Sequence, residues 1–273
     1  MAKTEDAKKK ITASRGPRLY CKVEDAGRIR VVTLNRPEVM NALTSDANFE
    51  LEAVWDEFAA RDDLWVGIVT GAGDRAFSAG NDLKMVAAGK RGPRPRTHFG
   101  GLTSRFDLNK PLIAAVNGVA MGGGFEMALA CDIVVAAENA VFALPEPRVG
   151  LTARAGGLHR LPRAIPLKQA MGMILTGRRV SAREGQELGF VNEVVAQGEA
   201  LNAAKRWAAM ILECSPMAVR ASKESVRRGL DEESLESAVR ALYPAQQANN
   251  ECQDYLEGPR AFAEKRKPNW QNK

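Results

Sequence analysis

A run of three glycines and a glutamate behind it are the residues of this chain whose spacing is best suited to chemistry. Gly122–Gly124 lie in NGVAMGGGFEMALACD, where a helix predicted to begin at the glycines would present backbone N–H groups to a ligand. The spacing is not that of a dinucleotide-binding loop, so the pattern suits a developing oxyanion better than a pyrophosphate. Glu126 follows one helical turn after Gly123 among apolar neighbours, where a carboxylate is costly unless it is paired or functional. Close helix–strand packing and a capping Glu126 would explain the same residues without chemistry, and this alternative stays open.

A second glutamate, Glu146, follows the next predicted strand in FALPEPRVG. Two carboxylates in one apolar cleft could hold and activate a water molecule and deliver a proton. The turn AGND at residues 79–82 ends another predicted strand and could supply a further backbone N–H. Two such amides, aimed at a thioester oxygen, typically contribute a few kcal/mol of transition-state stabilisation. An acidic residue at a helix start is the plain alternative for Glu146.

The elements that must position these residues form an α/β pattern. Hydrophobic patterning predicts a helix from residue 44 or 45 to about 60, and four apolar runs predict strands at 28–34, 66–70, 112–116 and 133–136. Short strands are expected at 76–79 and 141–143, and later helices at 200–212, 216–228, 233–247 and 258–267. The sequence therefore predicts a mobile basic tail over residues 1–18, a core over 19–198 and a helical C-terminal region over 199–273.

Composition excludes several classes of protein. Among 273 residues, 45% are hydrophobic, which excludes a wholly disordered chain. Two histidines and four scattered cysteines leave no metal-ligand set, so no metal site is predicted. The longest apolar stretch, residues 112–137, carries Asn117, Glu126 and Asp132 and is no membrane span. The N-terminus lacks the apolar core of a signal peptide, so a cytoplasmic protein is expected.

The net charge of +6 is compatible with nucleic acid, an anionic membrane or a phosphorylated small ligand. A basic tail and the basic loop at 84–96 make RNA binding a remote alternative. Against it, no RNA-binding motif or interleaved aromatic residues occur, and we expect no nucleic-acid partner.

Six segments in order resemble the enoyl-CoA hydratase/isomerase (crotonase) superfamily, and the resemblance covers the chain from about residue 19 to its C-terminal end. They are LNRPEVMNAL (34–43), FSAGNDLK (77–84), KPLIAAVNGVAMGGGFEMALACDIVVA (110–136), FALPEPRVGL (142–151), LTGRRVSAREGQELGFVNEVV (175–195) and AFAEKRKPNW (261–270). The resemblance implies a spiral of ββα units with a helical C-terminal trimerisation region. It also implies an acyl-CoA substrate, no separate cofactor because coenzyme A is part of that substrate, and self-association as a trimer or a dimer of trimers.

The resemblance also implies roles for individual residues. The backbone N–H groups of Asn81 and Gly123 would stabilise the thioester enolate, and Glu126 and Glu146 would hold the water. The positions that match coenzyme A or substrate contacts are Ala42, Asp82, Leu83, Lys84, Phe262 and Lys265, the last two near a subunit boundary.

Both glutamates together favour an enoyl-CoA hydratase, which adds water reversibly and syn across the 2,3 double bond. Enoyl-CoA isomerase and thioester hydrolase chemistry are alternatives. Within the superfamily, FGGLTSRFDLNKP (99–111) and EGPRAFAEKR resemble the carnitinyl-CoA dehydratase (crotonobetainyl-CoA hydratase) group, which is a further alternative, although the sequence shows no aromatic cage for a trimethylammonium group. Three positions depart from the family pattern: Glu38 replaces a lysine near the CoA phosphates, Ala153 replaces a proline, and Arg154 is an added cation. Arg154 is either close to the expected acyl pocket, within reach of an acidic substrate group, or a solvated loop residue, and both interpretations stay open.

Overall fold

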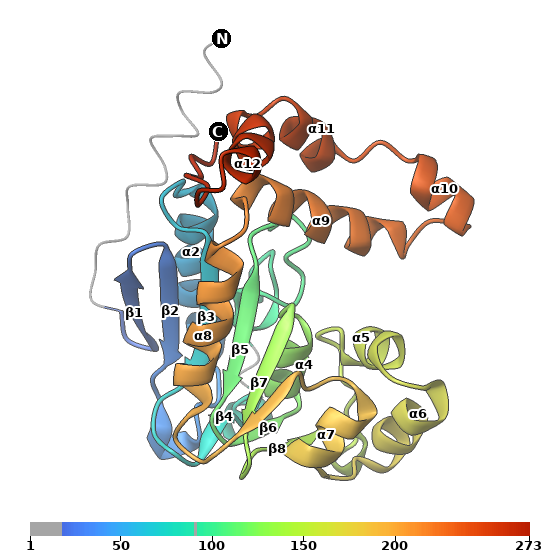
Figure 1. Cartoon of the computed structure of the whole chain (residues 1–273). Helices are drawn as coiled ribbons and strands as arrows, with labels where there is room; N and C mark the ends of the chain where they lie inside the picture. The colour runs from blue at the N-terminus through green and yellow to red at the C-terminus, as the bar shows by residue number, and fades with distance from the viewer. Residues whose placement is uncertain (1–17, 90–91) are drawn as a thin grey trace, which may run out of the picture.

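The computed structural model of the chain describes residues 18–89 and 92–273 (Figure 1). The predicted mobile tail over residues 1–18 therefore lies, apart from Arg18, outside the described residues. The predicted boundary between residues 198 and 199 stays a prediction.

Two sheets form the centre of the fold. The larger has six strands in the order β1-β2-β3-β5-β7-β10, and the smaller has four in the order β4-β6-β8-β9. The larger sheet consists of β1 (Cys21–Ala26), β2 (Ile29–Leu34), β3 (Val66–Gly71), β5 (Leu112–Val116), β7 (Ile133–Ala137) and β10 (Glu193–Val195). The smaller sheet consists of β4 (Ala76–Ser78), β6 (Val119–Met121), β8 (Val141–Ala143) and β9 (Val180–Ser181).

The chain winds between the two sheets as a spiral. The successive strand pairs β3 and β4, β5 and β6, and β7 and β8 each place their first strand in the larger sheet and their second in the smaller. Within each sheet these strands pair in parallel, whereas β1 with β2 and β8 with β9 are antiparallel. Successive turns of the spiral therefore stack the ends of β4, β6 and β8 side by side.

Helices cover both sides of this framework. In the core they are α2 (Ser45–Ala60), α3 (Leu83–Ala87), α4 (Gly123–Leu129), α5 (Gly157–Ala164), α6 (Leu167–Thr176) and α7 (Ala182–Leu188), with 3-10 turns η2 (Pro37–Val39), η3 (Phe99–Gly101) and η4 (Glu146–Val149). The C-terminal region contains α8 (Ala200–Leu212), α9 (Pro216–Gly229), α10 (Leu235–Arg240), α11 (Pro244–Asn250) and α12 (Gln253–Ala263). Figure 1 shows α8 lying across the larger sheet and α9–α10 extending away from it as an arm.

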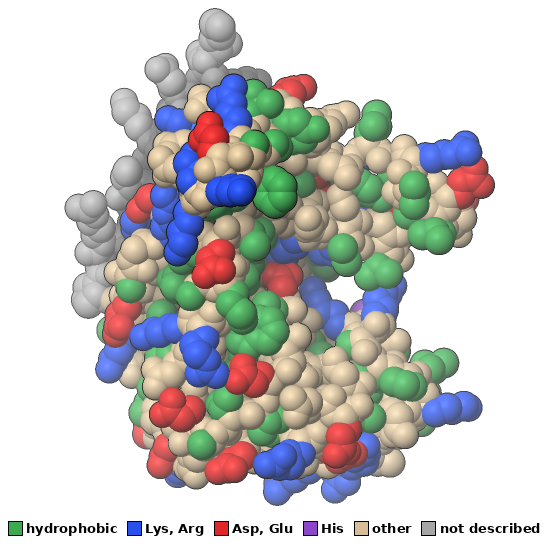
Figure 2. Space-filling model, viewed as in Figure 1, with side chains coloured by type: hydrophobic (Ala, Val, Ile, Leu, Met, Phe, Trp, Pro, Cys, Tyr) green, Lys and Arg blue, Asp and Glu red, His purple; other side chains and the backbone are tan. Residues whose placement is uncertain are grey.

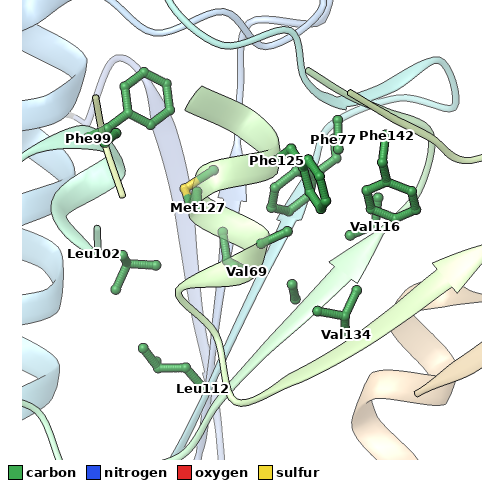
Figure 3. Packing of buried hydrophobic residues seen from close by; sticks show 14 of the residues in the cluster. Val69, Phe77, Phe99, Leu102, Leu112, Val116, Phe125, Met127, Val134 and Phe142 are labelled. Carbon is green, nitrogen blue, oxygen red and sulfur yellow. The ribbon is translucent and has the colours of Figure 1, made fainter. Parts of the chain in front are cut away.

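The central strands of the larger sheet are buried on both faces. Strand β3 sends Val69 into the core shared with α2 and α4, and Ile68 into the core under α8. Phe125 of α4 and Phe142 of β8 pack in the first core with ring centroids 5.2 Å apart (Figure 3). Burial on both faces explains why the sequences of β3, β5 and β7 are predominantly apolar, whereas the edge strand β1 is largely exposed.

Two C-terminal helices differ from the prediction. The single helix expected at 233–247 is two helices, because Pro244 begins α11 and the residue before it is extended. The helix expected at 258–267 begins earlier, at Gln253, and ends at Ala263. The helices α5 and α6 were not predicted as separate elements.

Asn41 fastens the loop after β2 to the start of β4. Its Oδ1 accepts a hydrogen bond from the Arg36 N–H at 3.0 Å, and its Nδ2 donates to the Ala72 and Ala76 carbonyls at 3.0 and 2.8 Å. The loop continues to Leu43, whose N–H donates to the Gly80 carbonyl at 2.9 Å. Asn41 thus fixes the backbone against which the 79–82 turn rests.

We predict that Asn41→Ala lowers the free energy of unfolding by about 3 kcal/mol, since it leaves buried polar groups unpaired and places alanine at a positive φ. Urea unfolding measures the change. The exposed Asn202, changed to Ala, is the matched control and is expected to cost less than about 0.5 kcal/mol. An equal effect of both substitutions would contradict this role of Asn41.

Candidate active site

Helix α4 approaches the smaller sheet more closely than a side chain would allow. A Cβ atom on Gly124 would lie 2.1 Å from the Ser78 carbonyl oxygen of β4. A Cβ on Gly123 would lie 2.6 Å from the Phe99 ring. Glycine at these positions therefore lets the start of α4 lie directly against the end of β4. This contact brings the glycine run 122–124 next to the 79–82 turn.

The Glu126 side chain points from α4 into the protein and is 2% exposed. Its Oε1 accepts hydrogen bonds from the backbone N–H groups of Ala155 at 2.7 Å and Gly157 at 2.9 Å. A Cβ on Gly157 would lie 3.0 Å from Glu126 Cγ, so the glycine makes room for the carboxyl group. These contacts fix the orientation of Glu126 and leave its other oxygen for a ligand.

Burial raises the pKa of Glu126 from 4.5 to about 7. The hydrogen bonds from Gly157 and Ala155 oppose this rise, and the negative charge of Glu146 adds to it. A carboxyl group with this pKa exists in both protonation states near neutral pH, as a group that exchanges protons with a substrate requires.

Glu146 stands at the start of η4 and faces the turn that precedes α4. A Cβ on Gly122, which has φ +53°, would lie 2.8 Å from Glu146 Oε1. Glu146 Oε2 is buried and has no hydrogen-bond partner among the described residues. Burial also raises the pKa of Glu146. Glu146 therefore combines a raised pKa with an oxygen that has no hydrogen-bond partner among the described residues.

The backbone of the 79–82 turn lies against that of Gly123. A Cβ on Gly80, which has φ +89°, would lie 3.0 Å from the Gly123 nitrogen. Within residues 18–89 and 92–273, the N–H groups of Asn81 and Gly123 donate no hydrogen bond to another backbone group. Two amides without backbone acceptors thus lie near each other beside the glutamates.

A cavity of about 630 Å³ lies beside these groups, and Gly123 is not among its lining residues. Of the predicted site residues, Asn81, Asp82, Glu126 and Glu146 line it. The other lining residues are Leu43, Thr44, Ser45, Asn48, Met85, Gly92, Pro93, Arg94, His98, Phe99, Gly150, Leu151, Thr152, Arg154 and Ala155. Four segments that are distant in sequence therefore form a single pocket around the two carboxyl groups.

The remaining predicted site residues lie outside the cavity wall. Ala42 is buried next to the lining residue Leu43, and Leu83 and Lys84 are exposed at the start of α3, next to Asp82. Phe262, near the end of α12, is 87% exposed, and Lys265 follows that helix on the surface. The structure of the single chain does not bring these last two residues to the glutamates.

His98 was not singled out by the sequence analysis. His98 lines the cavity, and its Nε2 accepts a hydrogen bond from Arg94 Nη1. Nothing in the local sequence marks this residue, because only the fold carries it to the pocket. Arg154, which the sequence placed near an acyl pocket, does line the cavity.

Two further properties concern metals and membranes. Within the described part of the chain, no group of three or more His, Cys, Asp and Glu residues could hold a metal ion. A search of the same residues finds no helix long and apolar enough to span a membrane.

Comparisons with known proteins agree with this geometry. The sequence model of the family Enoyl-CoA hydratase/isomerase matches residues 24–273. The chain therefore belongs to the enoyl-CoA hydratase/isomerase family. Its curated relatives include a carnitinyl-CoA dehydratase of Salmonella agona, 42% identical over 259 residues that cover 90% of this chain and 96% of the relative.

Solved structures of the family have the same fold. An enoyl-CoA hydratase from Mycobacterium tuberculosis H37Rv is 38% identical with a TM-score of 0.86, and one from Mycobacterium marinum is 39% identical with a TM-score of 0.88. Each match covers 94% of this chain and 100% of the other. The predicted crotonase-type α/β spiral with a helical C-terminal region is confirmed.

We predict that Glu126→Gln stabilises the protein against unfolding more at pH 8 than at pH 4.5. Because the pKa is raised from 4.5 to about 7, the folded state holds a proton that the unfolded state has lost, so the stability of the wild type falls through this interval. Glutamine removes this loss, which amounts to about 3 kcal/mol.

Urea unfolding at both pH values, at one protein concentration, measures the difference between variant and wild type. The exposed Glu187, changed to Gln, is the matched control. A Glu126→Gln difference that is the same at both pH values would show that the carboxyl group is not desolvated as described.

Proposed function

We propose that the protein catalyses the reversible syn addition of water across the 2,3 double bond of a 2-enoyl-CoA thioester, and the reverse dehydration. The observation that carries this proposal is the pair of carboxyl groups, buried Glu126 and part-buried Glu146, that line one cavity together with Asn81. Family membership supports the same reaction class, a carbon–oxygen lyase. The cytoplasmic location stays a prediction.

The amides of Asn81 and Gly123 bind the thioester oxygen in this proposal. Attack of water at C3 pushes charge onto that oxygen, and two backbone donors stabilise the enolate as it forms. Preorganised donors in a cavity are effective because they need not reorient during the reaction. The coenzyme A part of the substrate activates the acyl group, so no further cofactor takes part.

The glutamates hold the water and move its protons. One carboxylate takes a proton from the water as the oxygen bonds to C3, and the other, protonated, carboxyl group gives a proton to C2. Because the pKa of Glu126 is raised to about 7, both its protonated and its ionised forms occur near neutral pH, as this step needs. The two free oxygens, Glu126 Oε2 and Glu146 Oε2, are the proposed water ligands.

Coenzyme A would extend from the amides along the 79–84 segment. Ala42, Asp82, Leu83 and Lys84 are the proposed contacts on this side. Asp82 forms an ion pair with Arg36, with 3.4 Å between Asp82 Oδ2 and Arg36 Nη1. Phe262 and Lys265 would reach the ligand of a neighbouring subunit, consistent with their exposed position on the single chain.

We predict that Glu126→Gln and Glu146→Gln each lower kcat for hydration of crotonyl-CoA at least about 100-fold, because each removes a proton-transferring group. Loss of the enoyl-thioester absorbance measures the rate, and circular dichroism verifies the fold. Glu187→Gln is the matched control and keeps the wild-type rate. Nearly unchanged hydration by Glu126→Gln, together with inactive Glu146→Gln, would contradict the two-carboxyl mechanism and leave Glu146 as the single proton-transferring group.

Self-association as a trimer or a dimer of trimers is the second part of the proposal. Helix α10 buries none of its residues, and Leu235 and Val239 on it are 81% and 77% exposed. A helix of six residues is unstable alone in water, so a second copy covering these side chains would explain it. Figure 2 shows apolar side chains along the arm and a hollowed surface beneath it.

We predict that wild-type protein sediments as three or six chains of 29.6 kDa, and that the double variant Leu235→Asp/Val239→Asp dissociates, because charges cannot be buried in an apolar contact. Light scattering after size exclusion measures the mass. Leu19→Asp, at a residue 67% exposed far from the arm, is the matched control and keeps the assembly. A monomeric wild-type protein would refute the proposal.

A further inference from the structure

One part of the cavity wall is cationic. Arg94, His98 and Arg154 all line it, and they come from two segments, the stretch before η3 and the loop between η4 and α5. Arg94 Nη1 lies 2.5 Å from His98 Nε2. Because a guanidinium group only donates, His98 accepts this bond as a neutral imidazole. The two arginines therefore supply the positive charge of this wall.

The three side chains affect one another. After burial, which has the largest effect, the charges of Arg94 and Arg154 both lower the pKa of His98. Both guanidinium groups are therefore close enough to His98 to disfavour its protonated form. Among the described residues, neither arginine forms a salt bridge with a carboxylate. The local positive charge is thus not neutralised by the protein.

The acidic residues of the cavity have other contacts. Glu126 Oε1 is held by two amides, and Asp82 is paired with Arg36. Glu146 faces the turn at Gly122. A negative group on a ligand is the remaining partner for the two arginines.

The segments that carry the cationic wall also contact the proposed reaction centre. Arg154 directly precedes Ala155, whose N–H donates to Glu126 Oε1 at 2.7 Å. His98 directly precedes Phe99, whose ring would meet a Cβ on Gly123. Neither segment is part of residues 79–84, which form the proposed path of coenzyme A.

We infer that the acyl group of the substrate carries a carboxylate beyond its double bond, which Arg154 binds with help from Arg94. This inference rests on the proposed function and names its substrate class, a dicarboxylic 2-enoyl-CoA. An arginine binds a carboxylate through charge-assisted hydrogen bonds in a planar geometry that fits both oxygens.

A trimethylammonium acyl group, such as the name of the curated relatives implies for them, does not suit this wall. A quaternary ammonium ion is bound by aromatic faces or carboxylates. Phe99 is the only phenylalanine, tyrosine or tryptophan among the described lining residues, and two guanidinium groups would repel the cation. This pocket therefore favours an acyl group with a negative end over one with a positive end.

Three substrates that carry their end group on the same carbon of the enoyl chain test the inference: 4-carboxybut-2-enoyl-CoA, 5-methylhex-2-enoyl-CoA and crotonobetainyl-CoA have a negative, a neutral and a positive end. We expect kcat/KM to fall in that order, with at least about a tenfold preference for the carboxylate over the neutral isostere. Arg154→Gln is expected to lower this ratio about tenfold, and Arg154→Glu to favour the positive substrate over the negative one. Arg163→Gln, an exposed arginine of α5 outside the cavity wall, is the matched control and leaves the ratio unchanged.

Each other result overturns the inference. A wild-type preference for the neutral or the positive substrate does so directly. A variant Arg154→Gln that slows all three substrates by one factor would show that Arg154 holds a phosphate of coenzyme A instead. If no substrate is hydrated, the proposed function fails, but the inference can still be tested by binding. Calorimetry then compares the affinities of glutaryl-CoA and 5-methylhexanoyl-CoA, and equal affinities would refute a carboxylate site.

Discussion

The close contact between helix α4 and strand β4 is the constraint on which the site depends. A Cβ on Gly124 would lie 2.1 Å from the Ser78 carbonyl, so any side chain there would push the helix away from the sheet. Moving the helix would separate the Gly123 amide from the Asn81 turn and withdraw Glu126 from the amides of Ala155 and Gly157. The glycines therefore act first on packing, and the arrangement of the polar groups is a consequence of that packing.

The same packing sets the acidity of the site. A carboxyl group that is 2% exposed loses its hydration, and the two N–H groups that contact Glu126 recover only part of this loss, so its pKa remains near 7. The fold thus maintains a group that is costly for stability and is suited to proton transfer.

The sequence predicted the local elements well and their spatial relations less well. The strand Leu112–Val116 and the start of helix α2 after Thr44 were predicted because periodicity and a capping side chain are local signals, and Thr44 does accept the Ala47 N–H. The break at Pro244 was also local but was outweighed by the helical pattern on both sides. The meeting of Glu126 and Glu146 in one cleft was a hypothesis from the residue types, to which the family resemblance added roles. The position of His98 had no signal at all, because non-local packing alone brings it to Arg154.

Two parts of the cavity wall have different roles, one in the reaction and one in the choice of substrate. The amides and carboxyl groups act on the thioester and the double bond, which every 2-enoyl-CoA has in common, and they are fixed by backbone contacts and glycines. The cationic wall faces the part of the acyl chain that differs between substrates, and it is built from arginine side chains on connecting segments. A change from Arg154 to another residue alters no strand, no helix and no hydrogen bond to Glu126, since Ala155 donates through its backbone. Substrate charge can therefore change within this fold without disturbing the reaction centre, which is why a relative's name for its substrate is a weaker guide to this pocket than its own charges.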